Sequence, residues 1–222
     1  ISSGSKVNVE HLKSISKLGL NLKSTNILEI GSNDNSLLKN FKSTSKILCG
    51  VDPSIKQNLK GRNVHLYKEF FNYKLSTKLR KKFDGFDFIF AINVIPHVKN
   101  LEEVIKGVSN LLNQKGFFIM EGVYLLNNIQ KGYFDTFYHE HVSTFSLFSL
   151  NKLLKKYNLK IIKTKLLTTQ GGSFRAHITH LNNDYKVCSN TKALLKKEFK
   201  LGLNKKIYYE KLKKVLDKKI KD

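Results

Sequence analysis

The chain has 222 residues, 41% of them hydrophobic, which is enough for one folded domain with an appendage and excludes wholesale disorder. Its formal net charge is +23, yet all but three of its 40 basic residues are lysine. Nucleic-acid readers rely on arginine for bidentate contacts to phosphate and guanine. We therefore interpret the charge as a compositional bias and expect no nucleic-acid partner.

Cysteine spacing and hydropathy argue against metal, disulfide-rich and membrane-spanning classes of protein. Cys49 and Cys188 are far apart and outside any C-x-x-C pair, so we predict neither a zinc site nor a disulfide. No stretch approaches the ~20 apolar residues of a membrane span, and residues 1–4 lack a signal-peptide pattern. We predict a cytoplasmic protein without a membrane partner. The chain does not begin with Met, which is consistent with a fragment.

Short apolar runs alternate with helical patterns in the first half of the chain. In chain order we expect a helix over 5–19, a strand over 26–31, a helix over 35–42, a strand over 46–51, a short helix from Pro53 to Gly61, a strand over 64–67 and a helix over 75–82.

The second half continues this alternation and ends differently. In chain order we expect a strand over 86–93, a helix over 100–112, a strand over 117–121, an insertion over 124–149, a helix over 150–159 and strands over 159–167 and 174–181. Gly171-Gly172 in the short link between the last two strands is typical of a hairpin.

Five strands alternating with helices predict an α/β fold, with a doubly wound, mostly parallel sheet and a terminal antiparallel hairpin. We expect the domain to span 1–185. The segment 186–222 is predicted to be a lysine-rich C-terminal helix, with its helical pattern over 191–222. Because that helix has few apolar anchors, we expect it to need a partner or a further domain.

The first strand ends in a turn that is typical of a nucleotide site. The apolar run Ile27–Ile30 breaks at Gly31, where the missing Cβ lets a ligand approach the backbone. Asp52 follows about 20 residues later, at the end of the next strand, where an acid can bind a ribose diol. The alternative is a generic α/β turn beside an exposed aspartate.

The residues after Gly31 limit which class of ligand the turn can bind. A dinucleotide turn would have the pattern G-x-G-x-x-G, but Asn33-Asp34-Asn35 stands there instead. Carboxylate and amide groups suit a cationic or zwitterionic ligand better than a diphosphate. Because ligands bind at the carboxyl ends of parallel strands, we expect the polar strand-end residues to converge on one edge. They are Asn33, Asp52, Asn93, His97 and Glu121.

Two short motifs resemble those of a known enzyme class. Glu29-x-Gly31-Ser32-Asn33-Asp34, followed by Gly50-x-Asp52-Pro53, is similar to motifs I and II of class I S-adenosylmethionine (SAM) methyltransferases. The resemblance implies the Rossmann-like fold of that class and SAM as the cofactor. The cofactor-binding residues that it implies are Glu29, Gly31, Asn33, Asp52 and Asn93.

Residues 133–143 concentrate groups that can move protons. Two histidines, two acids and two tyrosines occur there, within the insertion that we expect to overhang the cofactor edge. A metal site is one alternative, but His139 and His141 have no third ligand at a usual spacing, so we predict no metal. A structural role is expected for His139. The same holds for the isolated histidines His11, His65, His177 and His180.

The same stretch resembles the sugar C-methyltransferase family. Tyr138-His139-Glu140-His141 follows Phe134-Asp135-Thr136 and precedes Gly171-Gly172-Ser173-x-Arg175, as in that family. Members act on nucleotide-linked deoxy-keto-sugars. They normally have an N-terminal zinc domain and a C-terminal α/β domain, and they have a glycine at the position of Asn35.

This resemblance implies SAM-dependent C-methylation through an enolate, with a nucleotide-diphosphate sugar as the substrate. It implies His141 as the base, Glu140 as an orienting group and Tyr138 as a donor to the developing oxyanion. His97 and Arg175 are expected to contact the substrate.

Two other functions stay open. The basic charge suggests a methyltransferase of RNA or another polyanion, although Asn93-Val94-Ile95-Pro96 stands where an N-P-P-[YF]-type motif would follow the fourth strand. A chain without the flanking domains could also be a non-catalytic module that binds SAM or a nucleotide sugar. The sequence does not give the oligomeric state.

Overall fold

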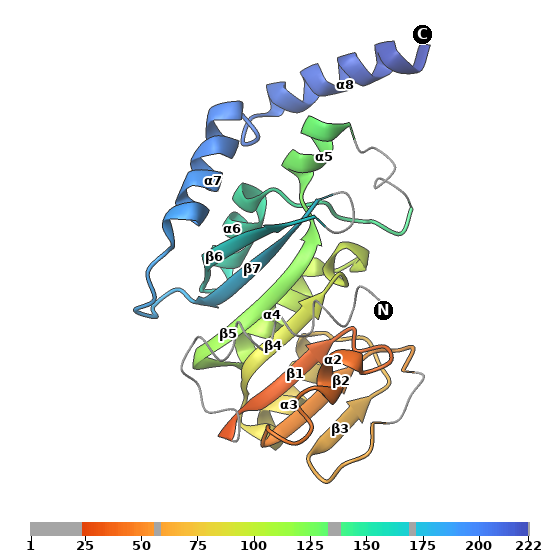
Figure 1. The fold of residues 1–222 in the computed structure, drawn as a ribbon, viewed down its shortest axis with the longest axis vertical. Helices are drawn as coiled ribbons and strands as arrows, with labels where there is room; N and C mark the ends of the chain where they lie inside the picture. The colour runs from red at the N-terminus through yellow and green to blue at the C-terminus, as the bar shows by residue number, and fades with distance from the viewer. Residues whose placement is uncertain (1–23, 56–58, 133–138, 169–171, 222) are drawn as a thin grey trace.

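The computed structural model describes residues 24–55, 59–132, 139–168 and 172–221 (Figure 1). The helix expected over 5–19 and the motif residues 133–138 lie outside this part of the chain. The short helix predicted from Pro53 to Gly61 is wrong where the chain is described, because 53–55 and 59–61 are turn or coil. There the Asp52 carboxylate accepts a hydrogen bond from the Ser54 amide, which favours a turn.

A seven-stranded sheet forms the centre of the fold, in the order β3-β2-β1-β4-β5-β7-β6. Its strands are β1 (Asn26–Ile30), β2 (Ile47–Val51), β3 (Val64–Tyr67), β4 (Phe86–Ile92), β5 (Leu112–Val123), β6 (Leu159–Leu167) and β7 (Ser173–His180). The pairs among β1 to β5 are parallel, whereas β7 runs antiparallel to both β5 and β6. This topology confirms the predicted doubly wound sheet with a terminal hairpin.

Helices connect the strands and continue beyond them. They are α2 (Ser36–Lys39), α3 (Tyr73–Phe83), the 3-10 helix η2 (Ile95–His97), α4 (Leu101–Leu111), α5 (Leu125–Lys131), α6 (Leu147–Lys156), α7 (Ser189–Leu201) and α8 (Lys206–Lys221). The short η2 follows β4 directly, so it lies at the carboxyl end of that strand.

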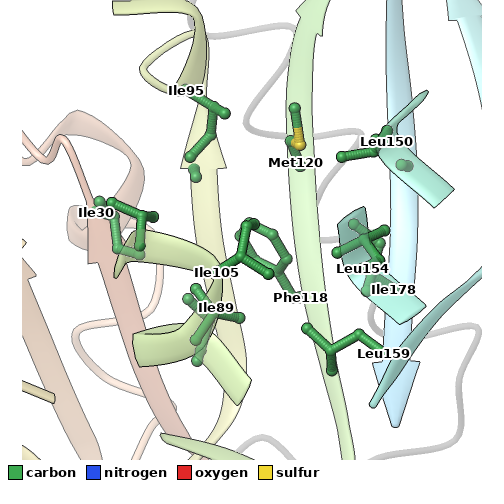
Figure 2. Close-up of a cluster of buried hydrophobic side chains, with 14 of the residues drawn as sticks. Ile30, Ile89, Ile95, Ile105, Phe118, Met120, Leu150, Leu154, Leu159 and Ile178 are labelled. Atoms are coloured by element: carbon green, nitrogen blue, oxygen red, sulfur yellow. The ribbon is translucent and has the colours of Figure 1, made fainter. Parts of the chain in front are cut away.

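Apolar side chains cover both faces of the sheet. Ile89 of β4 and Phe118 of β5 belong to the larger cluster, where they lie beside Ile105 of α4 (Figure 2). Phe88 and Phe90 belong to a second cluster. Because successive strand residues point to opposite faces, this alternation means that β4 is buried on both sides. Its polar neighbours lie at its two ends, with Asp87 near the start of the strand and Asn93 directly after it.

Two helices in and after the insertion differ from the prediction. α5 lies within 124–149, where no helix was expected. α6 begins at Leu147, three residues before the predicted start. The cause is Ser146, whose hydroxyl accepts a hydrogen bond from the Ser149 amide at 3.1 Å and so caps the helix.

The single helix predicted over 191–222 is wrong. α7 ends at Leu201, and α8 begins at Lys206. Between them, Gly202 has a φ of 84° and donates its amide to the Phe199 carbonyl at 3.0 Å. Glycine adopts this left-handed conformation without the steric cost of a Cβ, and the helix ends there. From that point α8 extends away from the sheet (Figure 1).

One buried carboxylate joins α7 to the domain. Glu198 is fully buried, and its two carboxylate oxygens accept hydrogen bonds from the backbone amides of Leu147 and Phe148, each at 2.7 Å. These amides lie in the first turn of α6, where no intrahelical acceptor exists. The negative charge also suits the positive end of the helix dipole. Glu198 therefore fixes the start of α6. We call residues 139–143, which precede this helix, the histidine segment.

We expect Glu198→Gln to lower the free energy of unfolding by about 1.5–3 kcal/mol, the usual worth of a hydrogen bond to a charged group. Glutamine keeps the shape of the side chain, but it loses the charge and turns a donor toward backbone amides that need acceptors. Denaturant unfolding followed by circular dichroism measures the change.

Glu210→Gln is the matched control for this prediction. Glu210 forms an exposed i,i+4 ion pair with Lys206 on α8, at 3.3 Å. Such pairs contribute about 0.5 kcal/mol or less. Equal stability of the two variants would show that the domain does not depend on the Glu198 cap.

Candidate functional site

The strand order brings polar strand ends together at one edge. β1 lies between β2 and β4, so the loops after these three strands are neighbours. The Asn33 amide donates to Oδ2 of Asp52 at 3.1 Å, which ties the loop after β1 to the end of β2. After β4, the Asn93 amide donates to the Glu121 carbonyl of β5 at 3.1 Å. The structure thus places Asn33, Asp52 and Asn93 along a single edge of the sheet.

The loops at this edge rely on left-handed backbone conformations. The φ angles are 75° at Gly31, 42° at Asn33, 58° at Asn35 and 55° at Asn93. Asparagine adopts this region more readily than other residues that have a Cβ. Position 35 departs from the glycine of the resembled family, yet its conformation suits both residue types. Asparagine is therefore compatible with the left-handed conformation that the loop has at position 35.

Asp52 organises the edge. Its side chain is buried, and its Oδ1 accepts hydrogen bonds from the amide and the hydroxyl of Ser54, each at 2.6 Å. Its Oδ2 holds the Asn33 amide at 3.1 Å. These bonds occupy both lone pairs of Oδ1 and one of Oδ2, so Oδ2 can accept one further hydrogen bond. The predicted ribose contact is therefore compatible with this arrangement of the loop.

Acceptor atoms predominate beside Asp52. Burial, followed by the nearby charge of Asp34, raises the pKa of Glu29 well above its ordinary value. Within the described part of the chain, Glu29 Oε2, Ser32 Oγ and Asn93 Oδ1 are buried and have no hydrogen-bond partner. Buried polar atoms are normally satisfied, so these atoms suit a ligand that brings donors and positive charge. The ammonium and sulfonium groups of SAM fit that requirement.

His97 and His141 lie together although they are far apart in the sequence. Their ring centroids are 4.9 Å apart, with the ring planes tilted by 54°. Nδ1 of His97 lies 2.9 Å from the Glu140 carbonyl oxygen. The Ser143 amide donates to the Pro96 carbonyl at 3.1 Å. η2 therefore holds the histidine segment at the carboxyl end of β4.

The contact with the Glu140 carbonyl shows which ring nitrogen of His97 carries a hydrogen. A carbonyl oxygen only accepts hydrogen bonds, so Nδ1 of His97 must carry the hydrogen and donate it. In the neutral ring, Nε2 is then the acceptor. This assignment follows from the hydrogen-bond geometry. His97 thus has one nitrogen committed to the segment and another that can accept a proton or a hydrogen bond.

The remaining residues of the predicted catalytic motif are placed differently. His139 Nε2 lies 4.0 Å from Glu140 Oε1, with the two side chains 89% and 63% exposed. At this exposure the ion pair contributes little. The contact of Glu140 with His97 is made by its backbone carbonyl. Tyr138 lies outside the described residues.

Arg175 is held in a buried ion pair. It lies opposite Glu121 in the register of β5 and β7, and its Nε contacts the Glu121 carboxylate. Both side chains are almost fully buried. Sequence reasoning placed Glu121 at the edge, but it could not pair the two residues, because the contact depends on strand register. A substrate contact by Arg175 stays a prediction.

Within the described ranges, no three His, Cys, Asp or Glu side chains lie close enough together to hold a metal ion. None of the helices in that part of the chain is both long enough and apolar enough to cross a bilayer.

Comparisons with known proteins give a family and one relative. The family profile described as "Methyltransferase domain" matches residues 6–164. C-methyltransferase NovU from Streptomyces niveus is 28% identical over 181 residues. That match covers 80% of this chain and 43% of NovU, so the chain spans less than half the length of this relative.

Solved methyltransferase structures share the fold. Magnesium protoporphyrin IX methyltransferase (ChlM) from Synechocystis with bound SAH has a TM-score of 0.58 and 14% identity, over 79% of this chain and 82% of that chain. N-methyltransferase NodS from Bradyrhizobium japonicum has a TM-score of 0.52 and 15% identity, over 77% of this chain and 96% of that chain. At such identities the likeness shows the fold alone.

We expect Gly31→Ala to lower the free energy of unfolding by about 2–4 kcal/mol and to weaken SAM binding. An alanine at position 31 would have to adopt a disfavoured φ of 75°. Its Cβ would also lie 2.6 Å from Cγ2 of Val94. Chemical denaturation and SAM titration measure the two effects.

Gly122→Ala is the matched control for this substitution. Its Cβ would lie 3.5 Å from Cγ of Pro96, an ordinary contact. A compatible Gly→Ala substitution changes stability by about 1 kcal/mol or less. If both variants keep wild-type stability and SAM affinity, then the turn at Gly31 does not need a glycine.

Proposed function

The chain belongs to the methyltransferase-domain family, and from this premise we propose that it catalyses SAM-dependent C-methylation of a nucleotide-linked keto-deoxysugar. NovU supports C-methylation, because its name describes a C-methyltransferase. The observation that supports the proposal is the pair of His97 and His141, which are held together at the carboxyl end of β4, beside the proposed cofactor residues.

SAM supplies to this site a methyl group on a positively charged sulfur, which is an electrophile. The proposed cofactor residues are Glu29, Gly31, Asn33, Asp52 and Asn93. Gly31 allows the left-handed turn at the end of β1, with the Val94 side chain packed against it, and Asp52 accepts from ribose hydroxyls. Glu29 and Asn93 provide buried acceptor oxygens for the cationic end.

The acceptor carbon must lose a proton before it can attack a methyl group. A carbon next to a ketone becomes nucleophilic as an enolate, and imidazole has a proton affinity that suits this step near neutral pH. We propose that His141 removes this proton. The electron pair left on the carbon is then available for the new bond to the methyl group. Glu140 orients the base, and Tyr138 donates to the enolate oxygen.

His97 and Arg175 are the proposed contacts to the sugar nucleotide. Nδ1 of His97 is committed to Glu140, so Nε2 is the atom that can accept from a sugar hydroxyl. Arg175 is proposed to meet a diphosphate or sugar oxygen, which requires the substrate to reach the buried pair with Glu121. The excess of lysine favours an anionic substrate of this kind.

We expect His141→Ala to slow methyl transfer by roughly 10²–10⁴-fold, the usual effect of removing a positioned general base. SAM affinity should hardly change, because the residue is proposed to face the sugar. A second measurement follows exchange of the sugar α-proton with deuterated water when SAM is replaced by its demethylated product, S-adenosylhomocysteine (SAH). The wild-type chain should catalyse this exchange, and the variant should not.

His139→Ala is the control for that experiment, because its side chain is exposed in the same segment. It should methylate and exchange like the wild type. Wild-type rates in His141→Ala would remove His141 as the base. A wild-type chain that binds the sugar nucleotide but neither exchanges nor methylates would instead be a binding module.

We expect His97→Asn and His97→Ala to separate two roles of His97. The amide of asparagine can replace the Nδ1 donor to Glu140, whereas alanine cannot. Limited proteolysis within the histidine segment should therefore rise only in His97→Ala. Both variants lose Nε2, so both should bind the sugar nucleotide about five- to tenfold more weakly. If His97→Asn binds the sugar like the wild type, His97 is not a substrate contact.

A further inference from the structure

Glu29 occupies a position where a charge is unusual. It lies inside the five-residue β1, between Gly50 of β2 and Phe90 of β4 in the strand register. Its side chain is 7% exposed. Ionised carboxylates are rarely buried without a cationic partner. The residue therefore needs a physical account that the strand itself does not give.

The surroundings of Glu29 are polar and acidic. A Cβ at Gly50, the register neighbour of Glu29, would lie 2.8 Å from Leu66 Cδ2 of β3, 2.8 Å from Ser32 Oγ and 2.9 Å from Asn35 Oδ1. Polar side chains of the loop after β1 thus close over the strand on this side. Among the described residues, Glu29 Oε2 and Ser32 Oγ have no hydrogen-bond partner.

The charges that reach Glu29 from its neighbours have the same sign. Burial raises the pKa of Glu29 most, Asp34 of the same loop adds to the shift, and Asp52 at the end of β2 adds further. A hydrogen bond from the Leu38 backbone amide of α2 opposes the shift without cancelling it. On the β4 side, the register neighbour Phe90 carries no charge. An added proton thus removes both the desolvation cost and the repulsion.

We propose that Glu29 holds a proton in the cofactor-free chain and releases it when the ammonium group of SAM binds. This inference rests on the proposed function, because it assumes that SAM occupies this edge. A cation beside Glu29 supplies the opposite charge and the donors that its Oε2 lacks. The same ligand offsets the charges of Asp34 and Asp52, so the ionised form of Glu29 becomes the favoured one.

The coupling between proton release and SAM binding can be measured as a dependence of affinity on pH. Release of one proton on binding makes the affinity rise about tenfold per pH unit, over the range where Glu29 is protonated in the free chain and ionised in the complex. A free α-amino group titrates at about pH 8, so the ammonium group stays charged below pH 7. Measurements between pH 5 and 7 therefore follow the protein and not the ligand.

Calorimetric titration of SAM into the 222-residue chain at pH 6, in buffers of different ionisation enthalpy, counts the protons. We expect the wild type to release about one proton. Glu29→Gln mimics the protonated side chain and should release none through this group. Glu210→Gln, which removes an exposed carboxylate from α8, should behave like the wild type.

A second measurement does not need the cofactor. A carboxyl group whose pKa is raised on folding contributes stability below its unfolded pKa of about 4.3, and that contribution is lost as pH rises through its folded pKa. Glu29→Gln should therefore gain stability relative to the wild type as pH rises from 5 toward 8. Glu210→Gln should show no such trend.

The outcomes separate the inference from the proposed function. If wild-type SAM binding has the same heat in all buffers between pH 5 and 7, Glu29 does not release a proton, while SAM binding still stands. If Glu29→Gln shows the wild-type dependence on buffer or on pH, the proton belongs to another group. If the wild type does not bind SAM, both the inference and the proposed function are wrong.

Discussion

The parallel order of β2, β1 and β4 is the constraint on which the site depends. It sets three strand ends side by side, and the chain must leave each of them through a tight polar loop. Left-handed conformations at Gly31, Asn33 and Asn93 make these exits possible. Asp52 then ties two of the loops together through the Asn33 amide. The apolar clusters cover both faces of the sheet, and within β1 the buried Glu29 interrupts the apolar run.

Local patterns in the sequence were sufficient to predict the sheet and to place Gly31 and Asp52 at the ends of their strands. The runs ending at Gly31 and Asp52 are short, and each strand carries its own apolar signal. Contacts between distant residues were beyond such patterns. His97 meets the Glu140 carbonyl only because η2 and the histidine segment pack together, and Arg175 meets Glu121 only through strand register. No periodicity encodes either pairing.

The C-terminal region shows why composition alone misled the helix prediction. Its many lysines made the segment resemble one long solvated helix with few anchors. The segment is anchored both by Glu198, which binds backbone amides of α6, and by Leu194, Leu195 and Leu203, which pack against the apolar core. The break is a single glycine, Gly202, near the middle of the lysine run. A glycine after an apolar residue is a helix-end signal, so the break was visible in the sequence, whereas the cap was not.

Net charge and site charge act over different distances in this chain. A net charge of +23 favours anionic ligands, such as the proposed sugar nucleotide, and opposes a cationic cofactor. At physiological salt, exposed charges are screened beyond about 8 Å, whereas buried ones are screened much less. Glu29 and Asp52 are buried, and Asp34 lies in the loop between them. The proposed cofactor would therefore experience the carboxylates at close range, while the lysine surface would attract the proposed sugar nucleotide from a distance. The local charge at this edge is therefore negative, because Glu29, Asp34 and Asp52 lie near one another there, although the chain as a whole is basic.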